Sequence, residues 1–381
     1  MESIDSSIGV TLTINGITCN DGNSKISKLS LEESISGEFP LLQIAVLLRH
    51  EFLSAPISDG SPVVLLINYP EYVVKSKDYK LMRFRVYYFE GHEVSNEAGL
   101  QYIISCMPEA YYKLNSISDL VFKGSSSSVF SGVAKELGID TNLCNTFDTQ
   151  VWFSLDGNRI SFLRHTCLHS WVDNLSVMCW WVNRYGILYL KNFTDEIKRE
   201  TTWKFFHNRN DDADRSQSIV FINSPRYISV SGENNTKEGY GKLNLVFSPQ
   251  DNDISTLKVN KLYSAAESVN VNKDIVQPMR YDSLGIKTTN VHQNYFEAEE
   301  QNQRGRTLYS MIVECFSNEA KDVLLGDTVF YEMKLGGEVE GLMYTGKYIV
   351  IGIETIFSAR STVTKYTLAR QGISIKANGT N

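Results

Sequence analysis

The sequence predicts a mostly β, α+β fold in which two antiparallel β-barrel domains flank one small α+β module. Short runs of β-branched and aromatic residues, separated by Gly, Asn, Asp, Ser or Pro, fill both ends of the chain. Apolar residues at helical spacing gather instead between residues 121 and 200. The chain has 381 residues, more than one ordinary hydrophobic core holds, so we expect more than one domain.

Residues 1–120 form the first predicted β-domain. The β-prone runs are IGVTLTINGIT, LLQIAVLLRHEF, SPVVLLINY, KLMRFRVYYFEGHEV and GLQYIISCMPEAYY. Short strands at this spacing indicate an antiparallel barrel or sandwich.

Residues 121–200 form the predicted α+β module. Ser128 can cap a helix that ends at Gly138, because hydroxyl side chains favour the start of a helix and glycine favours its end. Its apolar side consists of Val129, Val133, Ala134 and Leu137. A second helical face consists of Ile160, Leu163, Cys167, Trp171 and Leu175. The run MCWWVNRYGILYLKN then predicts a hairpin that turns at residues 183–186.

Residues 201–381 form the second predicted β-domain, with an insertion around 266–305. Strands such as SIVFINSPRYISVSG, TLYSMIVECF and GDTVFYEMK alternate with polar loops. The inserted segment has few apolar residues until NYFEAEEQNQRGR, for which we expect a short helix.

The ribbon at residues 346–372 is apolar on both faces of its first strand. One face carries Ile349, Ile351, Ile353 and Phe357, and the other carries Tyr348, Val350 and Ile356. We expect one face to pack inside its own barrel, while neighbouring domains or subunits cover the other. Gly352, in mid-strand, would allow the bend or bulge that a closed barrel needs.

The charge and the apolar runs exclude several classes of protein. The formal net charge is −7, so the chain lacks the basic footprint of a protein that binds duplex DNA tightly. The longest apolar run, FPLLQIAVLL, is too short for a membrane helix, and the beginning MESIDSSIG is acidic rather than a basic leader. We therefore expect a soluble, unexported protein without membrane insertion.

The six cysteines are scattered and include no C-x-x-C pair. They are Cys19, Cys106, Cys144, Cys167, Cys179 and Cys315. In a long chain without a secretion signal, this pattern favours free, buried thiols in a reducing compartment.

Two polar loops resemble ligand sites but lack the required residues. Gly341–Tyr348 has the glycines and the Lys347 of a phosphate loop, but Tyr348 occupies the position of the required Ser or Thr and opens a strand, not a helix. Residues 210–215 cluster carboxylates as a calcium loop does, but Arg215 and Phe221 occupy the positions of its glycine and glutamate. Both segments are more simply loops.

His165 and His169 lie four residues apart on a predicted helix and can share one face. A metal-dependent hydrolase is the corresponding functional alternative, but a catalytic zinc needs a third protein ligand. The H-E-x-x-H form also needs a glutamate where this chain has Thr166. Helix packing is the simpler interpretation.

Trp171, Trp180 and Trp181 suggest a second alternative, a glycan-binding host-recognition protein with a sugar-stacking platform. Core packing, with Trp171 sealing its helix onto the strand of Trp180, is the simpler interpretation. No G-x-S-x-G motif occurs, and adjacent acids such as Glu32 and Glu33 point apart on a strand. We therefore predict no catalytic, cofactor-binding or metal-binding residues, and no enzyme.

Three stretches resemble the central baseplate hub proteins of contractile-tailed phages and the related late control protein D family. The first is LSLEESISGEFPLLQIAVLL, similar to the opening β-segment of that family. The second is VFSGVAKELGI, with the following helix and the MCWWVNRYGILYLKN hairpin, similar to its middle module. The third is the C-terminal order of TLYSMIVECF, LLGDTVFYEMK and KYIVIGIETIFSARSTVTKYTLAR.

The resemblance implies two tail-tube-like β-barrels in each chain and a homotrimer whose six barrels form a ring. It also implies a structural, non-enzymatic role in the virion tail baseplate, after assembly in the host cytoplasm. The ring would join the tail tube, or a tube-initiator protein, to a central spike or tail lysozyme. DNA and the tape-measure protein would pass through its lumen without specific binding, and no cofactor is implied. An acidic chain suits such a channel, since carboxylates repel phosphates.

Overall fold

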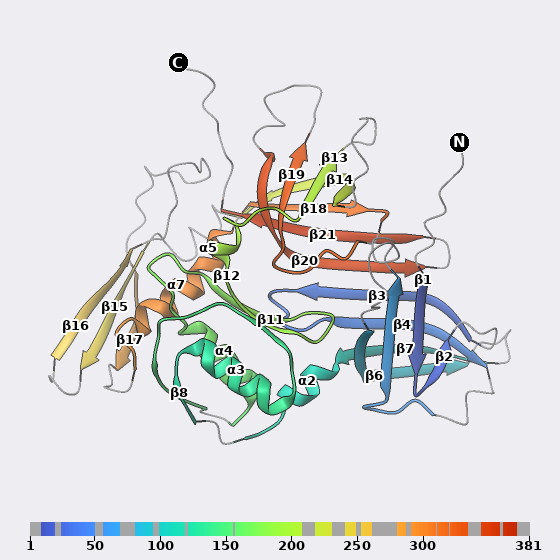
Figure 1. Cartoon of the computed structure of the whole chain (residues 1–381), viewed down its shortest axis with the longest axis horizontal. Helices are drawn as coiled ribbons and strands as arrows, with labels where there is room; N and C mark the ends of the chain where they lie inside the picture. The colour runs from blue at the N-terminus through green and yellow to red at the C-terminus, as the bar shows by residue number, and fades with distance from the viewer. Residues whose placement is uncertain are drawn as a thin grey trace, which may run out of the picture.

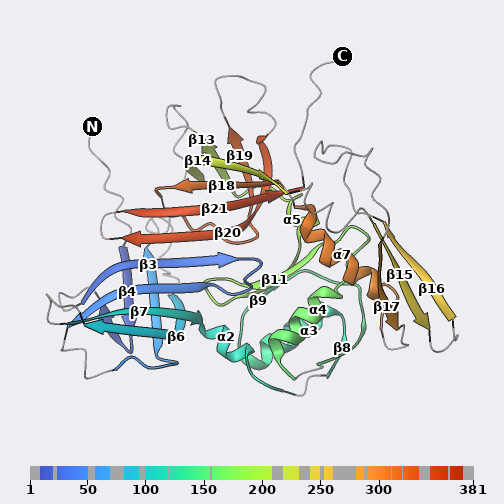
Figure 2. The same cartoon turned by 180° about the vertical axis from the view of Figure 1, so that it is seen from behind.

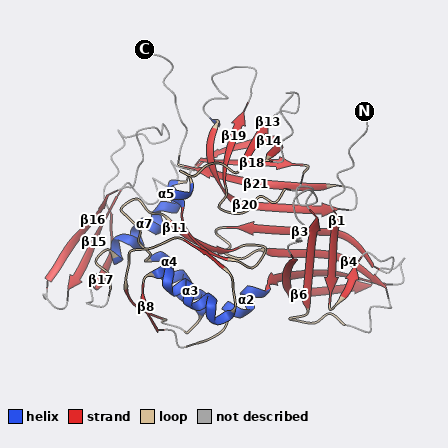
Figure 3. Ribbon diagram, in the orientation of Figure 1, coloured by secondary structure: helices blue, strands red, loops and turns tan. Residues whose placement is uncertain are grey.

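The computed structural model shows a mostly β chain with a small helical part (Figures 1 and 3). It describes residues 9–19, 24–49, 56–68, 81–93, 99–118, 121–154, 157–207, 218–230, 241–248, 253–260, 280–286, 291–309, 311–319, 321–333, 344–358 and 361–371. The strands within these ranges form four sheets, so the expected mostly β, α+β class is confirmed.

Seven strands form the sheet of the first β-domain, and every pairing between them is antiparallel. They are β1 (Gly9–Ile14), β2 (Ile17–Cys19), β3 (Ser24–Ser34), β4 (Leu41–Arg49), β5 (Pro62–Asn68), β6 (Leu81–Glu93) and β7 (Gly99–Pro108), in the spatial order β3-β4-β7-β6-β5-β1-β2. Alternate side chains point into one core, as Leu42, Ile44 and Val46 of β4 do. The period-two pattern of the sequence thus decides which face is buried.

The described residues from Glu109 to Glu196, which cover the module and the segment before it, contain four helices and five short strands. They are α2 (Glu109–Leu114), β8 (Val121–Gly124), α3 (Ser126–Leu137), β9 (Thr141–Leu143), β10 (Gln150–Phe153), α4 (Arg159–Leu168), β11 (Met178–Val182), β12 (Leu188–Asn192) and α5 (Phe193–Glu196). β11, β12 and β9 form one sheet, and β10 pairs with β8. The expected hairpin turn is confirmed, because Asn183 and Gly186 close it by backbone hydrogen bonds.

The start of α3 differs from the prediction. Ser125, not Ser128, is the N-cap, and its hydroxyl accepts a hydrogen bond from the Ser128 N–H. Buried Asp148 selects this start because its carboxylate accepts hydrogen bonds from the backbone N–H and the hydroxyl of Ser126. Gly138 ends the helix in the left-handed conformation, as predicted.

The second predicted helix is too long. α4 ends at Leu168, and Leu175, placed on its apolar face by the sequence, is 51% exposed beyond it. The amide of Asn302 stops the helix, since it donates to the carbonyls of Leu168 (3.0 Å) and Ser170 (2.7 Å). Asn302 comes from a distant part of the chain, so local spacing cannot predict this end.

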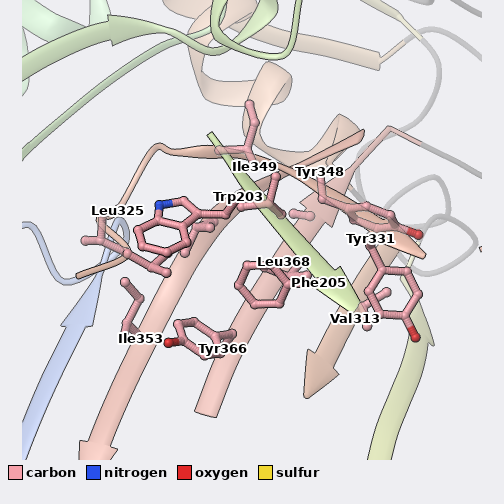
Figure 4. Packing of buried hydrophobic residues seen from close by; sticks show 14 of the residues in the cluster. Trp203, Phe205, Val313, Leu325, Tyr331, Tyr348, Ile349, Ile353, Tyr366 and Leu368 are labelled. Carbon is pink, nitrogen blue, oxygen red and sulfur yellow. The ribbon is translucent and has the colours of Figure 1, made fainter. Parts of the chain in front are cut away.

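Six strands of the second β-domain close into a barrel. They are β13 (Trp203–His207), β14 (Ile219–Ser229), β18 (Met311–Ser317), β19 (Thr328–Met333), β20 (Gly346–Ser358) and β21 (Thr362–Arg370). Their order is β19-β13-β14-β18-β21-β20, and pairing of β19 with β20 completes the ring. β13 runs parallel to both of its neighbours, which differs from the expected all-antiparallel arrangement. Phe205, Tyr366 and Leu368 pack inside it (Figure 4).

The elements between β14 and β18 lie outside the barrel. β15 (Gly241–Ser248), β16 (Asp253–Asn260) and β17 (Arg280–Ile286) form a separate sheet in the order β16-β15-β17. α7 (Tyr295–Leu308) follows and packs along the module (Figure 1).

Strand β20 belongs to both β-domains. Its first half pairs with β19 of the barrel, from Gly346 to Ile349, and its second half pairs with β3, from Gly352 to Ser358. The register with β21 shifts between Val350 and Gly352, so the predicted bulge at Gly352 is confirmed. As a result β18, β21, β20, β3, β4 and β7 run as one layer across the molecule (Figures 1 and 2).

Both apolar faces of the first half of β20 are covered within the chain. Tyr348 and Val350 of the second face and Ile349 of the first are each 0% exposed, whereas Ile356, further along the second face, is only partly buried. The three fully buried side chains share one cluster with module residues such as Trp181. Sister subunits are therefore not needed to bury this part of the ribbon, and the neighbouring module is the cover.

Candidate assembly surface

The outer side of the shared layer carries a row of charged residues. We call it the shared face and define it by Glu32 of β3, Glu354 of β20, Lys365 of β21, Glu314 of β18 and Arg226 of β14. The register places Glu354 between Glu32 and Lys365, and Glu314 opposite Arg226. Nζ of Lys365 lies 2.8 Å from Oε1 of Glu314, and the Arg226 guanidinium lies 3.7 Å from Oε2 of Glu314.

The chemistry of the shared face is that of a hydrated surface. Its ion pairs are partly exposed, and such pairs contribute only about 0–1 kcal/mol each. Both signs of charge occur across the strands, although Glu32 and Glu354 are neighbours of the same sign, and the chain as a whole is negative. A surface of this kind holds no anion tightly, because each cation already has a carboxylate neighbour.

Glu33, directly after Glu32, points to the opposite face and enters a buried ion pair. The predicted divergence of these two acids is thereby confirmed, since Glu32 is exposed and Glu33 is 1% exposed. The carboxylate of Glu33 contacts the guanidinium of Arg184 and accepts a hydrogen bond of 3.0 Å from the Arg184 backbone N–H. Arg184 also donates to the carbonyl of Val323 at 2.9 Å. One side chain thus ties the module hairpin to β3 and to the loop before β19.

His165 of α4 and His169, the C-cap residue directly after it, do lie together, with ring centroids 4.5 Å apart. The other members of this cluster come from the segment around α7. The Tyr295 ring stacks on His169 at 3.7 Å, and its hydroxyl lies 3.1 Å from Nε2 of His165. Nε2 of His292 lies 3.0 Å from the carbonyl oxygen of His169. The cluster therefore docks α7 onto α4. In the residues that the structure describes, no group of three or more His, Cys, Asp or Glu is placed to hold a metal ion.

The histidine cluster makes the stability of this docking depend on pH. Burial, and secondarily the charge on His165, lowers the pKa of His169 from 6.5 to about 3. Burial also lowers the pKa of His165 and of His292, although Asp148 acts in the opposite direction on His292. Below pH 6.5 the unfolded chain therefore binds protons that the folded chain excludes. The contribution of the neutral histidines to the free energy of unfolding is fully present above this pH and is lost as the pH falls towards 3.

We expect the free energy of unfolding to fall by roughly 2 kcal/mol between pH 7 and pH 5 through His169 alone. Chemical unfolding followed at several pH values measures this loss. His169→Phe keeps a ring against Tyr295 but has no proton to gain, so its stability should vary less over the same range. An equal pH dependence in both proteins would contradict the assignment.

The three tryptophans do not form an open platform. Trp171, Trp180 and Trp181 are 5%, 2% and 1% exposed. Trp180 packs edge-on against Phe39, and Trp181 stacks on Tyr189 at 5.1 Å. They serve the core, which removes the surface that a glycan would need.

The two candidate loops offer no ligand site within the described residues. Lys347 lies in β20, and its ammonium donates to the carbonyl oxygen of Arg199 at 2.8 Å. The glycine-rich part of the first loop, at residues 341–343, and the acidic stretch at 210–215 lie outside the described residues. Five of the six cysteines are buried thiols, as expected; burial raises the pKa of the sixth, Cys144, to about 11.

Comparison with known proteins gives a match in structure but not in sequence. No family model matches the chain, and no curated protein matches it. A tail protein from Neisseria meningitidis MC58 superposes with a TM-score of 0.62 at 10% identity, over 96% of this chain and 98% of that chain. The 43 kDa tail protein of prophage MuSo2 from Shewanella oneidensis gives 0.57 at 10% identity, over 96% and 97%. This chain has the fold of phage tail proteins.

The phage tail fold extends to a protein of bacterial secretion. An Escherichia coli component of the type VI secretion system, described as structurally similar to the T4 bacteriophage tail proteins gp27 and gp5, gives a TM-score of 0.52 at 9% identity. The match covers 97% of this chain and 78% of that chain. No helix among the described residues is long and apolar enough to cross a membrane.

Proposed function

We propose that the chain is a structural hub protein of a phage tail that assembles as a homotrimeric, pseudo-sixfold ring. One observation carries the proposal: β20 leaves its own barrel at Gly352 and pairs with β3 of the first β-domain. Two β-domains, at residues 1–120 and 201–381, thereby share one sheet. Neighbouring β-domains in a ring of six would be joined in the same way. Three copies supply six such members, which matches the sixfold symmetry of a tail tube and the threefold symmetry of a spike.

The shared face is the surface that we assign to the lumen of this ring. It carries charged residues beside the exposed ring of Phe316, it spans both β-domains, and it lies opposite the buried cores. Carboxylates such as Glu32 and Glu354 repel phosphates, while Lys365 and Arg226 are already beside Glu314. DNA and the tape-measure protein would therefore slide past it without tight binding.

The ring would have a different partner at each end. We assign one end to the tail tube or tube-initiator protein and the other to a central spike or tail lysozyme, in the baseplate of the virion after assembly in the host cytoplasm. The likeness to tail proteins and to a protein similar to gp27 and gp5 supports this placement. The role is one of assembly rather than catalysis.

Mass photometry and electron microscopy of the purified chain test the proposal. We expect trimers, seen in projection as rings with six subdivisions and an open centre. A chain that stays monomeric at every concentration, both alone and with tail components, would refute the ring.

A further inference from the structure

Two long strands are paired along only half of one edge. β6 pairs with β7 as far as Glu93, but β5 covers it only from Leu81 to Arg85. β14 pairs with β18 over its second half, but β13 covers it only from Ile219 to Ile222. Among the strands that the structure describes, none pairs with residues 88–93 or 223–228 on these other edges.

The chain already contains one completed junction of this kind. β20 is covered by β19 over its first half, and its second half extends beyond the barrel to pair antiparallel with β3. Each β-domain contributes four strands to the shared layer. In the first β-domain they lie in the order β3-β4-β7-β6, so β3 and β6 are the outer strands. In the second they lie in the order β20-β21-β18-β14, so β20 and β14 are the outer strands. The inner pair, β3 with β20, is joined within the chain, which leaves β6 and β14 as the ends of an eight-stranded layer.

Resting on the proposed ring, we infer that residues 226–228 of β14, which follow the bulge between Asn223 and Arg226, pair antiparallel with residues 88–90 of β6 in the next copy. Every pairing within the layer is antiparallel. β14 and β6 stand at opposite ends of these eight strands, so they run in opposite directions. When a second copy is placed at the end of the layer, its β6 therefore lies antiparallel to β14 of the first copy. The partner at this edge is another molecule of the same chain.

The side chains select one register for this junction. Tyr88 and Glu90 are exposed on the outer side of β6, and Arg226 lies opposite Glu314 on the outer side of β14. Shifting one strand by a single residue would bring an outer side chain opposite an inner one. Among the registers that keep the faces matched, the one that places Arg226 opposite Glu90 pairs opposite charges and brings Ile228 opposite Tyr88. Arg226 would then lie between two carboxylates.

Exposed apolar side chains gather beside these same edges. Tyr87 and Tyr88 of β6 are 57% and 51% exposed, and Ile103 of neighbouring β7 is 37% exposed. Phe316 of β18, beside β14, is 38% exposed. Aromatic residues exposed next to an unpaired strand edge are typical of a surface that a partner covers.

Charge reversal tests the register. Arg226→Glu or Glu90→Arg alone should raise the concentration for half-maximal ring assembly by at least about tenfold, because each places like charges opposite one another. Combining the two changes should restore assembly, which excludes misfolding as the cause. Lys135→Glu, which reverses one charge at an exposed position of α3, is the matched control and should leave assembly unchanged.

Cysteine cross-linking tests the neighbours directly. A chain with both Ile228→Cys and Tyr88→Cys should form interchain disulfides on oxidation and run as a covalent ladder up to the trimer. Each single variant lacks one half of the junction and should stay uncrosslinked. Ile228→Cys combined with His92→Cys has the same faces in a displaced register and should cross-link poorly.

The outcomes separate this inference from the proposed function. Suppose that the wild type forms rings, that neither charge reversal changes assembly, and that the chain with Ile228→Cys and Tyr88→Cys forms no interchain disulfide. This result would overturn the strand pairing but not the proposed ring. A chain that forms no ring under any condition would overturn both. Cross-linking together with rescue by the double charge reversal would establish the junction.

Discussion

Replacing Arg184 by methionine is expected to lower the free energy of unfolding by about 3–5 kcal/mol, since a buried charge that loses its partner is left without compensation. Both Arg184 and Glu33 have side chains that are 1% exposed. Arg184→Met also leaves the carbonyl of Val323 without this donor. The pair lies beside the point where β3 meets β20, because Glu33 is in register with Ile353. Its loss should therefore loosen the joint between the two β-domains and the module.

Chemical unfolding of the wild type and of three variants measures this effect. Changing Glu33 and Arg184 together to methionine should recover most of the lost stability, since no unpaired buried charge remains. Lys198→Met breaks the exposed pair with Asp195 and is the matched control, with an expected loss below about 1 kcal/mol. A loss at Arg184→Met as small as that of the control would show that the pair is not buried.

Local patterns in the sequence predict the parts of the fold that depend on neighbours along the chain. The alternation in β4 gives its buried face, and Gly352 gives the bulge in β20. Glycine also predicts the end of α3, because Gly138 adopts the left-handed conformation that favours it. Each of these features is determined within a few residues.

Features that depend on distant partners were not predictable in this way. Alternation indicates which face of a strand is buried but not which strand lies beside it, so the parallel pairings of β13 and the junction of β20 with β3 were missed. Glu32 and Glu33 look alike in the sequence, yet only the fold brings Arg184 to one of them. Only half of the histidine cluster was predicted. The four-residue spacing brings His165 next to His169, but it does not indicate that Tyr295 at the start of α7 packs against them.

Trp181→Ala should remove about 3–5 kcal/mol from the free energy of unfolding, because it empties a large volume at the joint between module and barrel. The ring of Trp181 stacks on Tyr189 with an interplanar angle of 7° and packs edge-on against Phe193. It also fills the space beside Gly326, where an added Cβ would lie only 2.7 Å from the indole. The surrounding residues come from three segments and cannot all close over the cavity.

Trp181→Phe is the matched variant for this prediction. It keeps an aromatic ring and removes an indole N–H that has no hydrogen-bond partner among the described residues, so its loss of stability should be clearly smaller than that of Trp181→Ala. Chemical unfolding of both variants beside a glycan-binding assay decides between the two roles of this residue. Unchanged stability in Trp181→Ala, combined with a loss of sugar binding, would mean that the indole faces solvent and would revive the glycan-binding alternative. A large loss of stability with no sugar bound by the wild type fits an indole that holds the module against the barrel.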